Sequence, residues 1–203
     1  MHYPDFFDTI PRLQMHDPLA DFLGAAEGGC IEYAYLDAVK LAGHSCPTVA
    51  SAYWLTCLAL RALYGATLPE RGGVQVTFRD SRVSGVTGVI ANVVSLLTGA
   101  TTDTGFKGLA GRFDRRDLLA FDAEQPLDIR FTRKDSGAAV DAMARLRDVP
   151  ADPQMAPLMQ RCLAGDASAD EAQRFRVLWQ DRVRRVLLEH ATDPDIFVIR
   201  HVD

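Results

Sequence analysis

The residues best suited to chemistry stand together early in the chain, where the sequence reads His44, Ser45, Cys46, Pro47. A spacing of two places the side chains of His44 and Cys46 on the same side of an extended segment. An imidazole nitrogen and a thiolate are both good ligands for zinc and similar divalent metals. The motif therefore indicates a metal site with His44 and Cys46 among its ligands.

The same motif supports two other interpretations. Pro47 suits the first turn of a helix, which would put Cys46 at a helix N-terminus, where the dipole stabilises a thiolate. Cys46 would then act without a metal, as a nucleophile or redox thiol activated by His44. Alternatively, both side chains are structural, because zinc sites need about three or four protein ligands. A third metal ligand would come from a distant residue, a partner subunit or water, with Asp80 and Asn92 as first candidates.

A second segment of chemical interest covers residues 96–108 and reads LLTGATTDTGFKG. Its glycines, threonines and lysine would present amides and an ammonium group to an anion. It is not a P-loop, because the Gly-Lys-Thr order is absent and the segment follows a helix. A helix C-cap followed by a turn is the structural alternative. The substrate-binding candidates are Asn92, Thr98, Thr101 and Lys107, and the catalytic candidates are His44, Cys46 and Lys107.

Together the two segments resemble the formylmethanofuran dehydrogenase FmdE family. Its members share His-Gly-His-x-Cys-Pro-Gly at the start of a helix, which Gly43, His44, Cys46 and Pro47 match. They also share a later helix that carries Cys-x-x-Asp-Ala and ends in Thr-Gly-Cys-Thr-x-Gly-Lys-Gly. The matching positions here are Thr98, Gly99, Thr101, Gly105 and Lys107, with an insertion near the lysine. The resemblance covers residues 35–131.

The chain departs from the family pattern at several candidate ligands. Ala42 replaces the first histidine, Ala100 replaces the cysteine of Thr-Gly-Cys-Thr, and Thr48 replaces the glycine after Cys-Pro. The cysteine and aspartate of the later helix align with Val89 and Asn92. The C-terminal cysteine-rich zinc finger of many relatives is not found in residues 150–203. The resemblance implies an α+β core, a homodimer and a metal at the histidine-cysteine motif, in a divergent branch of the family.

Periodicity and turn residues predict the elements that position these segments. We expect a short helix within 16–29 capped by Asp17, a buried apolar helix at 48–64, and a second at 86–97. The second carries a stripe of small and polar residues, namely Gly88, Asn92 and Ser95. Alternation predicts strands at 74–78 and 127–131, and a helix is expected near 137–147. Residues 30–43 fit either a strand or a helix.

The character of the chain changes at residue 150. Helices are expected at 157–163 and 169–191, the second with a Ser168/Glu171 capping box, and an extended segment follows at 195–202. Helices and strands occur without regular βαβ alternation, which predicts an α+β fold. We expect a single mixed core at 1–149, with buried helices packed on a β-sheet. A C-terminal helical extension at 150–203 would pack on this core or on a dimer partner.

Composition excludes some classes of function. The 203 residues carry a net charge of −5, so the basic surface of a nucleic-acid-binding protein is missing. The apolar segments are too short and too interrupted to span a bilayer, and the first residues lack a secretory pattern. Four cysteines without paired spacing are expected to be thiols or ligands in a reducing compartment. We therefore expect a cytoplasmic protein with neither a nucleic-acid nor a membrane partner.

The leading hypothesis is a homodimeric FmdE-like protein that binds a divalent metal, with zinc expected, through His44 and Cys46. It would act on a small polar or anionic substrate as a metal-assisted enzyme, or serve an oxidoreductase. Two alternatives stay open. One is a metal-free cysteine-dependent enzyme that uses Cys46 and His44. The other is a non-catalytic accessory subunit of an oxidoreductase, whose C-terminal helices contact its partner.

Overall fold

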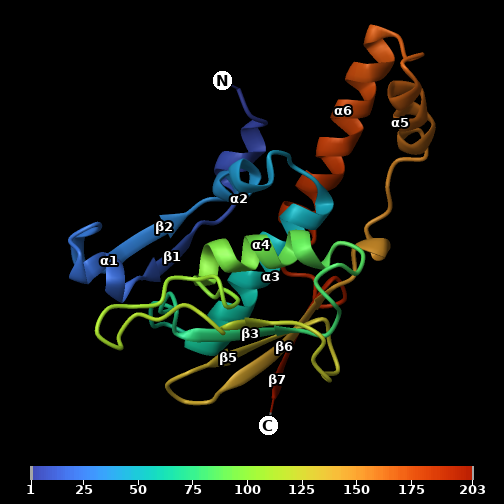
Figure 1. Cartoon of the computed structure of the whole chain (residues 1–203). Helices are drawn as coiled ribbons and strands as arrows, with labels where there is room; N and C mark the ends of the chain where they lie inside the picture. Colours follow the sequence, from blue (N-terminus) through green and yellow to red (C-terminus); the bar gives the residue numbers. More distant parts are fainter. Residues whose placement is uncertain (1, 203) are drawn as a thin grey trace.

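A mixed five-stranded sheet forms the base of the structure, a computed structural model that describes residues 2–202 (Figure 1). The strands lie in the order β4-β3-β5-β6-β7. β4 runs parallel to β3, and the other neighbours are antiparallel. The bounds are β3 Val74–Phe78, β4 Leu119–Ala120, β5 Ile129–Arg133, β6 Ala139–Ala144 and β7 Phe197–Val202. The alternating burial of β3 and β5 matches the strands predicted at 74–78 and 127–131, the latter shifted by two residues.

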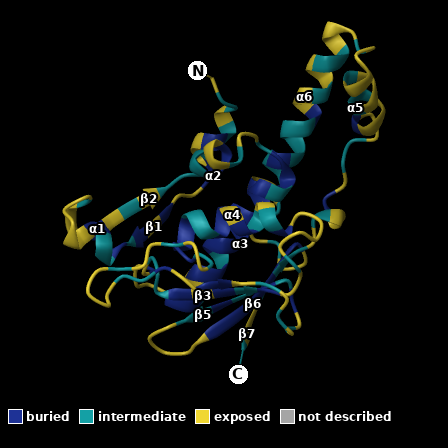
Figure 2. Ribbon diagram, in the orientation of Figure 1, coloured by how far each residue is buried: buried dark blue, intermediate teal, exposed yellow. Residues whose placement is uncertain are grey.

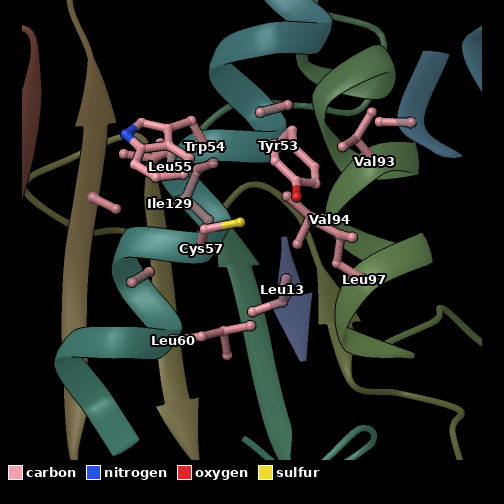
Figure 3. Close-up of a cluster of buried hydrophobic side chains, with 14 of the residues drawn as sticks. Leu13, Tyr53, Trp54, Leu55, Cys57, Leu60, Val93, Val94, Leu97 and Ile129 are labelled. Carbon is pink, nitrogen blue, oxygen red and sulfur yellow. The ribbon is translucent and has the colours of Figure 1, made fainter. Parts of the chain in front are cut away.

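Two apolar helices, α3 (Pro47–Tyr64) and α4 (Thr87–Thr98), cover one face of this sheet (Figure 1). Helix α3 buries 14 of its 18 residues, because α4, the sheet and the C-terminal segment surround it. Figure 3 shows side chains of α3 between Val93, Val94 and Leu97 of α4 and Ile129 of β5. Gly65 ends α3 and Gly99 ends α4, both with positive φ. The predicted α+β class with buried helices on a sheet is confirmed.

The N-terminal part forms a two-stranded ribbon beside this core (Figure 1). The ambiguous segment 30–43 contains both predicted types of structure, a strand followed directly by a helix. Asp17 caps α1 as predicted, accepting hydrogen bonds from the amides of Leu19 and Ala20. The elements are η1 Asp5–Thr9, β1 Leu13–His16, α1 Pro18–Phe22, η2 Glu27–Gly29, β2 Cys30–Tyr33 and α2 Tyr35–Ala42.

The C-terminal part forms a helical arm and then returns to the sheet. Helices α5 (Met155–Ala164) and α6 (Ala169–Arg184) project away from the core, with many exposed residues near their tip (Figure 2). The predicted capping box at Ser168 and Glu171 is present. After α6 the chain makes a wide π-helical turn, η4 (Arg185–Glu189), whose buried side chains contact α3. Strand β7 then pairs with β6, so residues 150–202 contribute both the arm and one strand of the main sheet.

The helix predicted near 137–147 is wrong, because residues 139–144 form β6. Alanines favour a helix in isolation, but tertiary pairing overrides that preference here. The turn at Gly137, with φ +76°, directs the chain back along β5. Both edges of β6 are paired, and Asp141 receives two hydrogen bonds from Arg130 across the ladder, at 2.7 and 2.9 Å. The short 3-10 turn η3 (Leu146–Asp148) follows.

A buried ionic cluster fastens the N-terminal ribbon to the core. Asp17 Oδ1 lies 2.8 Å from Arg115 Nη2, and Asp17 Oδ2 lies 3.1 Å from Arg71 Nη1. Burial acts to raise the pKa of Asp17, but amide hydrogen bonds and the two arginines outweigh burial and lower it. The Arg115 guanidinium packs against Gly72, where an added Cβ would lie 2.1 Å from Arg115 Nη1.

Among residues 2–202, no helix is long and apolar enough to cross a membrane.

Gly72→Ala should destabilise the fold far more than Gly137→Ala. Both glycines have positive φ, at +80° and +76°, so alanine is strained at either position by about 1–2 kcal/mol. Only the Cβ at 72 would also push Arg115 off Asp17, and disrupting a buried ion pair costs about 3–5 kcal/mol. Urea unfolding of the two variants measures the difference, and equal losses would contradict the packing role of Gly72.

Candidate functional site

His44 lies in the turn between α2 and α3 and is exposed. Gly43 ends α2 with φ +74°, which turns the chain so that His44 Nδ1 lies 2.9 Å from the carbonyl oxygen of Ala42. A carbonyl oxygen can only accept a hydrogen bond, so Nδ1 carries the proton. This leaves Nε2 as the atom available to a ligand. The same orientation by a backbone carbonyl is usual for histidines that bind metals.

Cys46, in contrast, is buried at the start of α3. It is the N-cap residue, as predicted, and its Sγ accepts a hydrogen bond from the amide of Val49 at 3.4 Å. Its side chain belongs to the hydrophobic core, whereas that of His44 is exposed. The two predicted ligands therefore face different surroundings.

The residues that the structure describes supply only part of the donor set of a zinc site. Within residues 2–202, no three His, Cys, Asp or Glu side chains come together in a way that could hold a metal ion. Asp80 is exposed, and its Oδ1 lies 3.5 Å from Arg79 Nε. Asn92 is exposed on α4. His44 and Cys46 are thus two potential donors without a third from the described part of the chain, and catalytic zinc sites use about three protein ligands.

Ser45 joins the motif to the C-terminal arm. Its carbonyl oxygen accepts hydrogen bonds from Trp179 Nε1 at 2.9 Å and from Gln180 Nε2 at 3.2 Å. Its hydroxyl lies 3.0 Å from Gln180 Oε1 and 2.9 Å from the hydroxyl of Tyr35. Burial raises the pKa of Tyr35, so this phenol stays protonated and can donate. Residues 135 positions apart in sequence thereby hold the turn around His44 in one conformation.

A groove of about 610 Å³ opens where this turn, α6 and the N-terminal segment meet. Its walls are mostly aromatic and aliphatic, and their rings support one another: Phe175 lies 5.6 Å from Trp179, and Phe7 lies 4.9 Å from Tyr35. The lining residues are Tyr3, Pro4, Phe7, Val39, Gly43, His44, Ser45, Phe175, Arg176, Trp179 and Gln180. Such a concave, mainly apolar surface with few polar groups is typical of small-molecule sites.

The second motif lies elsewhere. Thr98 is buried, and its hydroxyl donates to the carbonyl of Val94 and accepts from the amide of Ala100. The Thr101 hydroxyl donates to the carbonyl of Arg115 at 2.5 Å. Both hydroxyls are therefore occupied within the chain, and Lys107 is exposed.

Asn92 and Thr101 line another hollow, of about 770 Å³, together with Ser95 and Arg82. His44 belongs to the lining of the other groove. The structure thus brings Asn92 and Thr101 together, and it separates them from His44 and Cys46.

Sequence reasoning missed the contribution of α6 to the surroundings of His44. Phe175 and Trp179 lie one turn apart on α6, but no local pattern indicates that this part of the helix meets residue 45. The two aromatic residues four positions apart, Phe175 and Trp179, are the signal that could have drawn attention to it.

No protein-family model matches the chain, and no curated protein matches it. Among solved structures, the chain is similar to a tungsten formylmethanofuran dehydrogenase FmdE-like protein from Syntrophus aciditrophicus. The identity is 18%, the match covers 84% of this chain and 73% of that one, and the TM-score is 0.43. With a TM-score of this size, membership of the FmdE family stays a prediction that rests on the two sequence motifs.

The burial of Cys46 predicts slow alkylation in the native protein. Cys30 is exposed and should react with iodoacetamide within minutes, whereas Cys46 and Cys57 must wait for local opening. Burial also raises the pKa of the Cys57 thiol to about 12, which leaves little thiolate there. Mass spectrometry of timed samples should show Cys46 labelled at least about a hundredfold more slowly than Cys30. Equal rates would instead favour the metal-free cysteine enzyme.

Proposed function

We propose that this chain is an FmdE-like protein that binds a small amphipathic acid, with an apolar body and one acidic group, in the groove beside His44. The observation that carries this proposal is the groove itself. It combines apolar walls with two basic side chains, those of His44 and Arg176, and the described residues of its lining include no acidic one.

The apolar walls select for the body of the ligand. Phe7, Val39, Phe175 and Trp179 offer rings and methyl groups, and burying apolar surface there contributes about 25 cal/mol per Å². A short aliphatic or aromatic segment would fill this space, whereas a fully hydrophilic molecule would gain little from it.

The polar groups select for the head of the ligand. Ser45 and Gln180 hydrogen-bond to each other, so they are engaged inside the protein. His44 Nε2 remains, together with Arg176, whose guanidinium donates a long hydrogen bond of 3.4 Å to Gln173. A neutral Nε2 accepts a proton from an acid, a protonated one donates to a carboxylate, and Arg176 supplies positive charge in either case.

Zinc binding at His44 is a second candidate, supported by the hydrogen bond that orients the ring with Nε2 available. It rests on the family resemblance and requires donors from outside one chain, which the expected homodimer would supply. When bound, zinc would act as a Lewis acid toward a polar ligand.

Titration with octanoate tests the proposed ligand class. Octanoate should bind saturably and alter the fluorescence of Trp179. Acetate, which lacks the apolar chain, and octanol, which lacks the acidic group, should bind more weakly. His44→Ala and Arg176→Gln should each weaken octanoate binding by about tenfold, the usual effect of losing a charge-assisted hydrogen bond. His201→Ala, an exposed histidine on β7, is the matched control. The proposal fails if octanoate does not bind, or if His44→Ala and His201→Ala bind it equally well.

Metal analysis of the purified protein tests the second candidate separately. About one zinc per chain that disappears in both His44→Ala and Cys46→Ala would support it. Sedimentation of the same samples would show whether the metal accompanies a dimer. Wild-type protein without stoichiometric metal after growth and purification with added zinc would rule this candidate out.

A further inference from the structure

The buried ionic cluster contains more positive than negative charge. Asp17 and Arg115 are only 4% and 5% exposed, and Arg71 joins them. Asp17 alone pairs directly with both guanidinium groups, while the charge of Glu70 also acts on Arg115. Asp17 also accepts two amide hydrogen bonds at the start of α1, so its oxygens are heavily shared. Because burying a charge without compensation is unfavourable, the excess charge calls for an explanation.

Two donor atoms of the cluster lack an acceptor. Arg115 Nη1 and Arg71 Nε are buried and have no hydrogen-bond partner among the described residues. Buried donors are almost always paired, by protein, water or a ligand. The unpaired donors indicate that the two arginines have a second task besides joining the N-terminal ribbon to the core.

The cluster forms one wall of a cavity of about 380 Å³. Two exposed cationic side chains, Arg112 and Lys134, line the same cavity. The acidic residues of the lining are Glu70 and Asp114, and Asp114 is held by Arg116 at 2.7 Å. The cavity and its cluster thus contain four cationic groups against three carboxylates, and Arg116 pairs with one of these, Asp114, from outside the lining.

We propose that this cavity binds the phosphoryl group of a small molecule, or free phosphate. Guanidinium groups match the geometry of phosphate oxygens, and several cations arranged around one cavity suit an anion with three or more acceptor atoms. The site is independent of the groove beside His44, since the two linings share no residue.

The four cationic residues have different tasks at this site. Arg112 and Lys134 are exposed and make the direct contacts. The loop of Arg112 is anchored to α1 by the rings of Phe113 and Phe22, 5.4 Å apart. Arg115 and Arg71 line the cavity beside the Gly72 turn, Arg115 buried and Arg71 partly buried, and their unpaired donors Arg115 Nη1 and Arg71 Nε are available to donate to a phosphoryl oxygen.

A second cavity provides room for the remainder of a ligand. It measures about 470 Å³ and shares Glu70, Gly72 and Lys134 with the first. Tyr64 and Leu68 contribute an apolar side to it. A phosphate monoester could thus place its phosphoryl group beside Arg112 and its organic part beyond Lys134.

Calorimetric titration with inorganic phosphate at low ionic strength tests the site. Phosphate should bind saturably and raise the melting temperature, as any ligand specific for the folded state does. Lys134→Gln and Arg112→Gln should each weaken binding by about tenfold. Lys40→Gln and Arg147→Gln remove exposed cations from α2 and η3, outside the cavity, and should leave the affinity unchanged.

The buried cluster and the source of the phosphoryl group are tested in the same way. Arg115→Lys keeps the charge but loses the planar fork, and a variant with a native circular dichroism spectrum should bind phosphate less tightly than wild type.

Tighter binding of glycerol phosphate than of phosphate would identify a monoester, and equal binding would identify free phosphate. The inference is overturned if wild type shows no saturable binding, or if Lys134→Gln and Arg112→Gln bind as well as their controls.

Discussion

The burial of α3 on every side is the constraint on which the rest of this structure depends. A helix that is apolar around its whole circumference cannot lie on the surface, so the sheet, α4 and the π-helical turn η4 must all cover it. The Trp54 indole of α3 is an example of this cover by the C-terminal segment, since its Nε1 donates a hydrogen bond to the carbonyl of Ala191 at 2.7 Å. The same burial fixes the start of α3, and with it the positions of Cys46 and His44.

The turn before α3 is where local and distant parts of the chain meet. Gly43 and the proline at position 47 shape it locally, but the hydrogen bonds from Trp179 and Gln180 to Ser45 bring the arm against it. Cys46 is drawn into the core as a helix cap, and His44 is left facing an apolar groove. The two residues of the histidine-cysteine pair therefore lie in different places, Cys46 in the core and His44 at the groove.

Burial also distinguishes the ion pairs of this structure from one another. Surface ion pairs such as Arg116 with Asp114 contribute little to stability. The ion pair of Arg115 and Asp17 differs from these surface pairs because it is buried, where water does not compete for the charged groups. The glycines at 72 and 99 leave just enough space for the Arg115 guanidinium. The second sequence motif has its clearest role here, since Gly99 packs against Arg115 and Thr101 holds its carbonyl.

The sequence by itself determined the elements with strong local signals. The apolar run at 48–64, the alternation at 74–78, the Asp17 cap and the Ser168 capping box each depend on neighbours a few residues away, and each was predictable. Only the tertiary structure decided that residues 139–144 form a strand, because β5 and β7 pair with both edges. It also decided that Trp179 meets Ser45, and that Asp17, Arg71 and Arg115 share one cluster. Those contacts join residues up to 134 positions apart, and no local pattern in the chain specifies them.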